Sequence, residues 1–376
     1  MIFLDNASTT KPYKEVLDVV DYYNNENYYN AGAIYNSAFK ISSELKKAKD
    51  SILSSLGAIR TDNFIFTSGA TESNNMVLRA FAKKNTKVLV SVAEHPSVYN
   101  TAMDLKNAGY NVDFIKITGE GVVDEDDLVQ KLTDDVSLVS IIHINNETGA
   151  VNDIKKLVSI VKRKNKNILF HSDGVQAFGK IPVNLTDLGV DFYTISGHKI
   201  HCVKGVGGLF VKDSKFIKPF ITGGGQQDAF RSGTENVSGM MGLKVACEKA
   251  KLLQASYYNK VSELKLHLLN NLDKSLNYKV VKSATNSPFI TMICCEGCRA
   301  ETLVHMMEDD GVLIGNGSAC SSKKKENRNL SQLGYSALDI EGAIRISFSD
   351  FNTLDEVKLA VDCLNKNVKE YLQRVR

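Results

Sequence analysis

The middle of the chain contains the stretch Phe192-Tyr193-Thr194-Ile195-Ser196-Gly197-His198-Lys199. Four mostly apolar residues run into small and polar ones, a pattern typical of a buried strand that ends in a loop. A similar run upstream, Ile168-Leu169-Phe170, is followed by Asp173. Lysine and aspartate are usually exposed. Their placement at the ends of two buried strands therefore points to a site at one edge of a sheet.

The sequence around these two runs alternates short apolar runs with amphipathic stretches. Between about residues 60 and 210, this alternation predicts an α/β layer with a mostly parallel, buried sheet. The amphipathic stretches include residues 124–132 and 153–164. The other apolar runs that we interpret as strands are Phe64–Phe66, Val88–Val92, Leu138–Ile144 and Gly207–Val211.

The C-terminal third of the chain follows a different pattern. It is helical from about Gly239 to Leu272, and strands and helices then follow in irregular order, which predicts a smaller α+β domain. The expected strands lie near 278–281, 289–294 and 344–348, and the expected helices near 300–309 and 354–372.

A chain of 376 residues is too long for one compact core. We therefore predict a large domain formed by residues 14–256. Residues 1–13 and 257–376 are predicted to form a small domain.

Composition excludes several classes of protein. With 43% hydrophobic and 24% charged residues the chain is ordinary and globular. A net charge of +3 predicts no general affinity for nucleic acid or membranes. Asp5 interrupts the N-terminal apolar residues, and no apolar run is long enough to span a bilayer. Together with seven scattered cysteines, which read as reduced thiols, this predicts a cytoplasmic protein.

The run Cys295-Glu296-Gly297-Cys298, with Cys294 beside it, has two interpretations. One is a redox or metal site. The other is a strand that runs into a turn, with the cysteines as small buried hydrophobic residues. Because there is no second CxxC or histidine pair at zinc spacing, the pattern favours the strand and turn. A metal-binding protein remains an alternative, which metal analysis of the purified protein would test. A redox role for Cys295 and Cys298 is also open.

The residues that follow the predicted strands matter because ligands of open α/β sheets bind beyond the carboxyl ends of strands. After Phe64–Phe66, the small residues 67–74 open a helix whose backbone N–H groups, with the Thr71 hydroxyl, could hold a phosphate. After Val88–Val92 comes His95, which could stack on an aromatic cofactor and carry protons. Asn146 follows the next run. Each feature alone is more often a helix cap, a structural histidine or an Asn-rich turn.

The last two strand ends carry Asp173 with Gln176, and Ser196 and His198 with Lys199. Pyridoxal phosphate (PLP) requires a lysine that bonds to it covalently and an acid that keeps its ring nitrogen protonated. Five successive strand ends that each carry a group suited to PLP predict a PLP site.

With these residues in view, the chain resembles the class V, fold-type-I PLP enzymes, specifically the cysteine desulfurases of the NifS/IscS-like branch. The resemblance covers essentially the whole chain and implies a large domain with a mostly parallel seven-stranded sheet. The motifs that carry it are residues 4–10, 67–74, 94–96, 145–149, 173–176, 196–199, 231–236 and 317–322.

The resemblance implies a role for each matching residue. Lys199 looks like the lysine that bonds to PLP, Asp173 like the partner of the ring nitrogen, and His95 like the stacked and catalytic histidine. Arg345, with Asn146, would bind the substrate carboxylate, a bidentate task that suits a guanidinium. The other implied cofactor-binding residues are Ala70, Thr71, Asn146, Gln176, Ser196, Gly197, His198 and Thr234. Thr234 matches a residue that reaches the phosphate of the neighbouring subunit, which implies a homodimer.

Cys320 lies between a small-residue turn and the polar stretch 321–329, beside three lysines that would favour its thiolate. The resemblance implies that Cys320 takes sulfur from L-cysteine as a persulfide and that L-alanine is released. The sulfur would pass to a protein acceptor, either an iron–sulfur scaffold or an enzyme of tRNA or cofactor thiolation, and the sequence does not say which. The alternatives are a selenocysteine lyase or aminotransferase of the same fold, and a non-catalytic binding protein.

The chain departs from the family pattern at three places. Residues 27–35 lack the usual Pro, and Tyr35 stands where a histidine is expected. Cys202-Val203-Lys204-Gly205 replaces the usual Gly-Pro-Lys-Gly. The segment after Cys320 is short, which favours dedicated thiolation of tRNA, or a thiamine-type pathway, over general iron–sulfur assembly.

Overall fold

A seven-stranded sheet forms the centre of the larger part of the computed structural model, which describes residues 1–59, 62–283, 285–317 and 327–375. Its strand order is β2-β8-β7-β6-β5-β3-β4. Only β8 runs antiparallel to its neighbours, so the predicted mostly parallel sheet is confirmed. The strands are β2 (Asn63–Thr67), β3 (Lys87–Ser91), β4 (Asn111–Ile115), β5 (Val136–Ser140), β6 (Leu169–Asp173), β7 (Phe192–Ser196) and β8 (Gly207–Val211).

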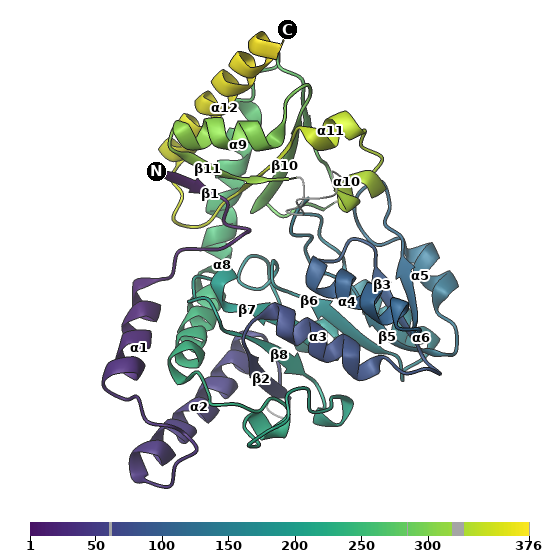
Figure 1. Ribbon diagram of the computed structural model, residues 1–376, viewed down its shortest axis with the longest axis vertical. Helices are drawn as coiled ribbons and strands as arrows, with labels where there is room; N and C mark the ends of the chain where they lie inside the picture. Colours follow the sequence, from purple (N-terminus) through teal and green to yellow (C-terminus); the bar gives the residue numbers. More distant parts are fainter. Residues whose placement is uncertain (60–61, 284, 318–326, 376) are drawn as a thin grey trace.

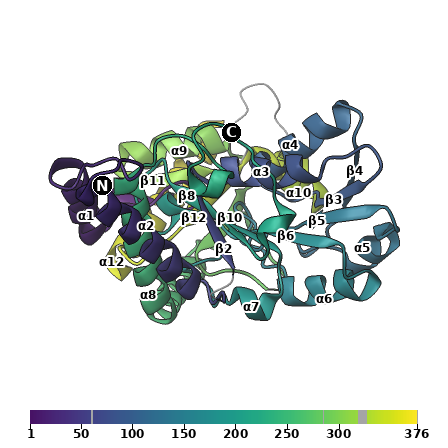
Figure 2. The ribbon, with the colours of Figure 1, turned by 90° about the horizontal axis from the view of Figure 1, so that it is seen from below.

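Helices cover both faces of this sheet, and Figure 2 shows α3 and α4 on one side with α6 and α7 on the other. Successive strand residues point to opposite faces. In β7, Phe192 therefore packs in the core under α3 and α4, whereas Tyr193 packs in the core on the other face. Full burial of both faces explains why the strands read as continuous apolar runs. The helices are α2 (Asn36–Ser55), α3 (Ala70–Phe81), α4 (Pro96–Asn107), α5 (Glu125–Lys131), α6 (Ile154–Lys164) and α7 (Leu185–Leu188).

A second sheet, in the upper part of Figure 1, has the order β1-β11-β12-β10-β9. The N-terminal strand β1 pairs parallel with β11, which brings the first residues of the chain beside residues 312–316. The other pairs are antiparallel, as expected for an α+β domain. The strands are β1 (Ile2–Leu4), β9 (Tyr278–Val280), β10 (Ile290–Cys295), β11 (Val312–Asn316) and β12 (Ala343–Ser347). The remaining helices are α1 (Lys14–Asn25), α8 (Val237–Asn270), α9 (Ala300–Asp309), α10 (Arg328–Gln332), α11 (Ala337–Glu341) and α12 (Leu354–Val375).

The long helix α8 connects the two parts (Figure 1). Its first half, including Met240 and Leu243, packs in the core of the larger sheet. Its second half, including Val261 and Leu264, packs in the core of the smaller sheet. The domain boundaries that we placed near residues 13 and 256 stay a prediction.

Three strands, β1, β4 and β11, escaped the sequence analysis. β4 is an edge strand with Asn111 and Asp113 within it, so its apolar pattern is weak. The run predicted as a strand over 138–144 ends earlier, at Ser140. Beyond it, the backbone N–H groups of Ile141 and His143 still donate to β6 before the chain turns away.

The CxxC run follows the predicted strand and turn. β10 ends at Cys295, and the turn contains Gly297 with φ of +81°. Cys294, Cys295 and Cys298 are buried, and burial raises the pKa of each thiol. Among the helices described, none combines the length and apolar character needed to cross a bilayer.

Candidate active site

A cavity of about 700 Å³ opens at the carboxyl ends of the parallel strands. Its wall comes from the segments after β2, β3, β5, β6 and β7, closed by the N-terminal segment and by β12. Ten residues predicted from the sequence line it: Ala70, Thr71, His95, Asn146, Asp173, Gln176, Ser196, His198, Lys199 and Arg345.

Two of the predicted residues that the structure describes, Gly197 and Thr234, are not in this wall. Gly197 is buried in the short 3₁₀ turn Gly197–Lys199, where an added Cβ would lie 3.0 Å from the Val206 carbonyl oxygen. Thr234 is exposed outside the cavity of its own chain. Cys320 lies outside the described residues.

Asp173 is the last residue of β6 and is almost completely buried. Its Oδ2 accepts a hydrogen bond from Asn74 Nδ2 at 2.8 Å, and its Oδ1 accepts one from the Val175 backbone N–H at 3.0 Å. Both oxygens are therefore oriented before any ligand binds, as a fixed partner for a cationic ring nitrogen must be.

Lys199 lies just beyond β7 and donates from Nζ to the carbonyl oxygens of Ala7, at 2.6 Å, and Ser8. Burial and, next, the positive charge of Arg345 lower the pKa of Lys199 to about 8, against the opposite effect of Asp5 and Asp173. A larger share of neutral amine near neutral pH makes this lysine a competent nucleophile.

Two histidines line the cavity. His95 immediately precedes α4, and its Nδ1 accepts from the Ser97 backbone N–H at 3.2 Å. Burial lowers the pKa of His95, and burial together with neighbouring lysines, Lys199 first, lowers that of His198 to about 4. His198 is therefore a neutral ring near neutral pH.

The start of α3 forms an anion cradle at one end of the cavity. No side chain caps this helix, and Gly69 precedes it with φ of 152°. The first backbone N–H groups of the helix, at Ala70 and Thr71, thus remain for a ligand, and the helix dipole favours a negative one. Gly207 of β8 packs so closely here that an added Cβ would lie 2.8 Å from Gly69 Cα.

Arg345 enters the cavity from β12 in the smaller sheet. Its Nη2 pairs with Asp5 Oδ1 at 2.8 Å, and its Nη1 donates to the Asn146 carbonyl oxygen at 2.9 Å. Its buried Nε has no hydrogen-bond partner among the described residues. A guanidinium held in this way at the cavity wall suits a carboxylate ligand.

Three residues that support this site were missed by the sequence analysis. Asn74 holds Asp173, Asp5 pairs with Arg345, and the buried Lys180 donates from Nζ to Gln176 Oε1. Burial lowers the pKa of Lys180 to about 7. Asn74 follows Ala70 by one helical turn and could have been found from that spacing. Lys180 lies only four positions after Gln176, but the segment between them is a turn and not a predicted helix, so the spacing alone did not identify the pair.

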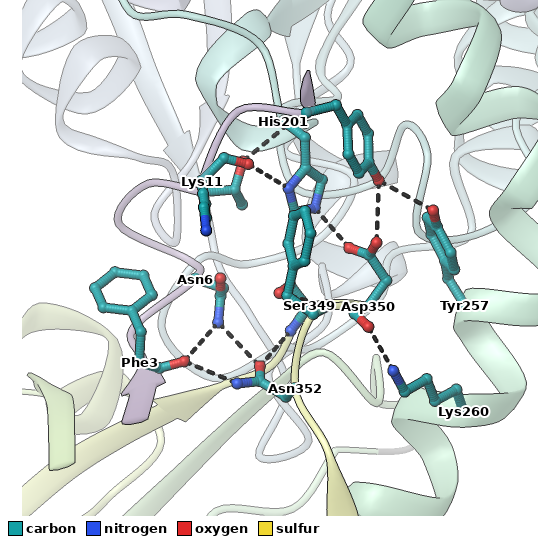
Figure 3. Close-up of polar contacts among 12 residues, drawn as sticks. Phe3, Asn6, Lys11, His201, Tyr257, Lys260, Ser349, Asp350 and Asn352 are labelled. Atoms are coloured by element: carbon teal, nitrogen blue, oxygen red, sulfur yellow. Dashed lines mark hydrogen bonds and ion pairs between the residues drawn. The ribbon is translucent and has the colours of Figure 1, made fainter. Parts of the chain in front are cut away.

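A polar network connects the backbone after Lys199 with the N-terminal segment and with the residues that follow β12 (Figure 3). His201 Nδ1 lies 2.8 Å from the Lys11 carbonyl oxygen, and its Nε2 pairs with Asp350 at 2.9 Å. Asn352 accepts from Asn6 Nδ2 at 3.2 Å and donates to the Phe3 carbonyl oxygen at 3.0 Å. The N-terminal segment, which supplies Ala7, Ser8 and Thr9 to the cavity, is thereby held against the residues that follow β12.

The order of strands in the two sheets and this cavity define a fold-type-I PLP enzyme architecture. The class-V aminotransferase family matches residues 2–359, and the chain belongs to that family. Enzymes of this family depend on PLP.

The chain is also similar to individual proteins of known name or structure. The chain is 33% identical to the cysteine desulfurase IscS of Dictyoglomus turgidum, over 98% of the chain and 95% of that protein. A solved NifS-like protein is 29% identical with a TM-score of 0.92, and the match covers 98% of this chain and 99% of that one. A structure described as SspA in complex with cysteine is 25% identical with a TM-score of 0.82, over 94% of this chain and 100% of that one.

Proposed function

We propose that the protein is a PLP-dependent cysteine desulfurase, which converts L-cysteine to L-alanine and carries the sulfur on Cys320. The observation that carries the proposal is the single cavity that joins Lys199, Asp173 and Arg345. The full-length similarity to proteins named cysteine desulfurase supports it, as does the similarity to SspA, whose structure contains cysteine.

The residues present fit PLP. Asp173 offers an oriented carboxylate for a cationic ring nitrogen, and Lys199 offers an amine for the covalent bond to the aldehyde. The uncapped start of α3, with Ser196 and His198 nearby in the wall, suits the phosphate. We propose that Ala70, Thr71, Asn146, Gln176 and Gly197 also shape this site. When bound, PLP supplies an electron sink that stabilises negative charge at the substrate Cα.

Side chains of this protein bind the substrate and transfer its protons. Arg345 binds the carboxylate of L-cysteine, with Asn146 beside it, and so fixes the substrate Cα. Lys199, once its amine is free, takes the Cα proton, because its depressed pKa gives it a larger share of neutral amine near neutral pH. His95 covers the ring as the second catalytic side chain.

The sulfur transfer needs a thiolate, and we propose Cys320. The Cys320 sulfur attacks the substrate sulfur, so that one S–S bond forms as the substrate C–S bond breaks. The electron pair of the C–S bond stays with carbon, which takes up protons and leaves as alanine. The persulfide on Cys320 then passes its outer sulfur to an acceptor protein of iron–sulfur assembly or of tRNA or cofactor thiolation.

We further propose that the protein acts as a cytoplasmic homodimer. Thr234, exposed outside the cavity of its own chain, is available to reach the phosphate of a neighbouring copy. The proposal for the location depends on the scattered thiols, which read as reduced.

The test uses L-cysteine as the only substrate. We expect the PLP-loaded protein to release sulfide and alanine in the presence of a thiol reductant. A Cys320→Ala variant should keep the visible absorption of bound PLP but lose at least about 99% of sulfide release, since removal of a nucleophile costs orders of magnitude. Cys363→Ala, which removes a half-buried thiol remote from the cavity, is the matched control and should stay active. Full activity of Cys320→Ala contradicts the proposal.

The alternatives give different results in the same assay. An aminotransferase requires a keto acid and releases no sulfide, and a selenocysteine lyase processes selenocysteine far better than cysteine. A non-catalytic protein shows no visible PLP absorption at all.

A further inference from the structure

His95 lies in a buried chain of hydrogen bonds that ends on Asp173. Asn74, one turn into α3, donates from Nδ2 to Asp173 Oδ2 at 2.8 Å and to Ser97 Oγ at 2.9 Å. Ser97 Oγ in turn lies 2.8 Å from His95 Nδ1. Asn74 is completely buried and Ser97 nearly so, which leaves little room for water to replace these bonds.

The donor and acceptor roles at Asn74 follow from Asp173. An ionised carboxylate only accepts hydrogen bonds, so the NH₂ group of Asn74 must face it. The opposite orientation of the amide would place two oxygen atoms against each other. Both N–H bonds of Asn74 are then used, and its Oδ1 has no partner among the described residues. The amide is held by its two donated hydrogen bonds alone.

The roles at His95 follow from Ser97. Because Ser97 Oγ accepts from Asn74, its own hydrogen is free to point toward His95 Nδ1. The Ser97 backbone N–H, which can only donate, also points at Nδ1, from 3.2 Å. Two donors directed at one ring nitrogen make Nδ1 an acceptor. A neutral imidazole in this setting carries its hydrogen on Nε2.

We propose that Asn74 and Ser97 are positioning residues that hold His95 as a neutral ring protonated only at Nε2. A proton added at Nδ1 would face both the hydroxyl and the backbone N–H of Ser97. The charged groups that act on His95 are Asp173, Lys199, Glu147 and Arg328. Burial is the largest influence and lowers the pKa of His95, in the same direction as the hydrogen-bond chain.

The tautomer limits the chemistry that His95 can perform. A neutral imidazole donates a hydrogen bond from Nε2, but it is a poor proton donor unless Nδ1 is also protonated. His95 thus covers the cofactor as an uncharged hydrogen-bond donor, and proton transfer falls to Lys199. This consequence rests on the proposed function, whereas the tautomer itself does not.

The test is nitrogen NMR of the full chain labelled with ¹⁵N-histidine, without added PLP. Chemical shifts distinguish protonated from unprotonated ring nitrogens, and a His95→Gln variant assigns the signals. From about pH 6 to about pH 8, which spans the ordinary histidine pKa, we expect His95 Nδ1 to stay unprotonated and Nε2 protonated.

Variants separate this role from general packing. Ser97→Ala should raise the pKa of His95 by about 1 unit and make the Nδ1–H form detectable, and Ser97→Thr should restore the original signal. Asn74→Leu should act in the same direction as Ser97→Ala, because the freed Ser97 oxygen can then accept from Nδ1. Thr101→Val is the matched control, since the Thr101 hydroxyl donates to the Ser97 carbonyl oxygen in the same helix and, among the described residues, makes no bond to His95.

A protonated Nδ1 in the unaltered protein overturns the proposal. So does a Ser97→Ala spectrum that matches the spectrum of Thr101→Val. Neither measurement uses PLP or turnover, so failure of the proposed enzyme function would leave this result unaffected.

Discussion

At the scale of single residues, the site is controlled by charges that the structure places around Lys199. Arg345 and Asp5 pair with each other, yet they push the pKa of Lys199 in opposite directions. The predicted strand ends located Lys199 and Asp173, because each lies within four residues of the end of an apolar run. These apolar runs do not identify Asp5. Its effect on the pKa of Lys199 depends on its position next to the smaller sheet, where it pairs with Arg345.

The first prediction concerns the pH dependence of PLP loading. Only the neutral amine of Lys199 attacks an aldehyde, and its share rises as pH increases through the pKa. The rate at which the apo-protein binds PLP should therefore rise with pH and level off above about pH 8. Visible absorption follows the reaction. A midpoint above about pH 10, the ordinary range of lysine, contradicts the prediction.

Two variants move this midpoint in opposite directions. Arg345→Gln removes a positive charge that lowers the pKa of Lys199, so the midpoint should rise. Asp5→Asn removes a negative charge that raises this pKa, so the midpoint should fall. If the midpoint moves in the same direction by the same amount in both variants, the two charges do not act on Lys199 as proposed.

At the scale of elements, the pairing of β11 with β12 positions the substrate-binding arginine. Gly315 lies opposite Arg345 in this pair. An added Cβ at Gly315 would lie 2.6 Å from Asp5 Oδ1 and 3.2 Å from Arg345 Nε. Glycine is therefore required at position 315 because a larger side chain would collide with the Asp5–Arg345 ion pair. The backbone conformation of the strand does not require it.

Gly315→Ala should displace the ion pair and weaken binding of the substrate carboxylate. We expect the KM for L-cysteine to rise by about tenfold, a loss of about 1.4 kcal/mol, with a smaller change in kcat. Steady-state kinetics measures both constants. The control is Gly119→Ala, where an added Cβ meets no atom within 4 Å. An unchanged KM for Gly315→Ala would remove the role that we assign to this strand pair.

At the scale of the whole molecule, the larger part carries an unusual exposed apolar surface. It comes from the connection between α1 and α2 and from the first turn of α2, which project from the body of the protein (Figure 1). Ile34 and Phe39 expose most or all of their side chains there, and Tyr28 is also exposed. Clustered exposed apolar side chains mark association surfaces in soluble proteins.

We predict that this surface takes part in the proposed homodimer. Light scattering should give twice the chain mass of 41.4 kDa. Phe39→Asp should shift the protein toward the monomer and reduce PLP retention, because Thr234 of the second copy is then lost. Leu359→Asp, which changes an exposed apolar residue on α12 of the smaller part, should leave the mass unchanged. A monomeric parent protein would refute the prediction.

The sequence by itself determined the layered α/β fold and the residues that follow each strand, because hydrophobic periodicity and the residues at strand ends are local properties. Asp173, His95 and Lys199 were found in this way. Only the tertiary structure decided which residues support them. Asn74 and Asp173 are 99 positions apart, and Asp5 and Arg345 are 340 apart. Such pairs depend on the order of strands in the sheets and on the return of the N-terminal segment to β11, which no local pattern encodes.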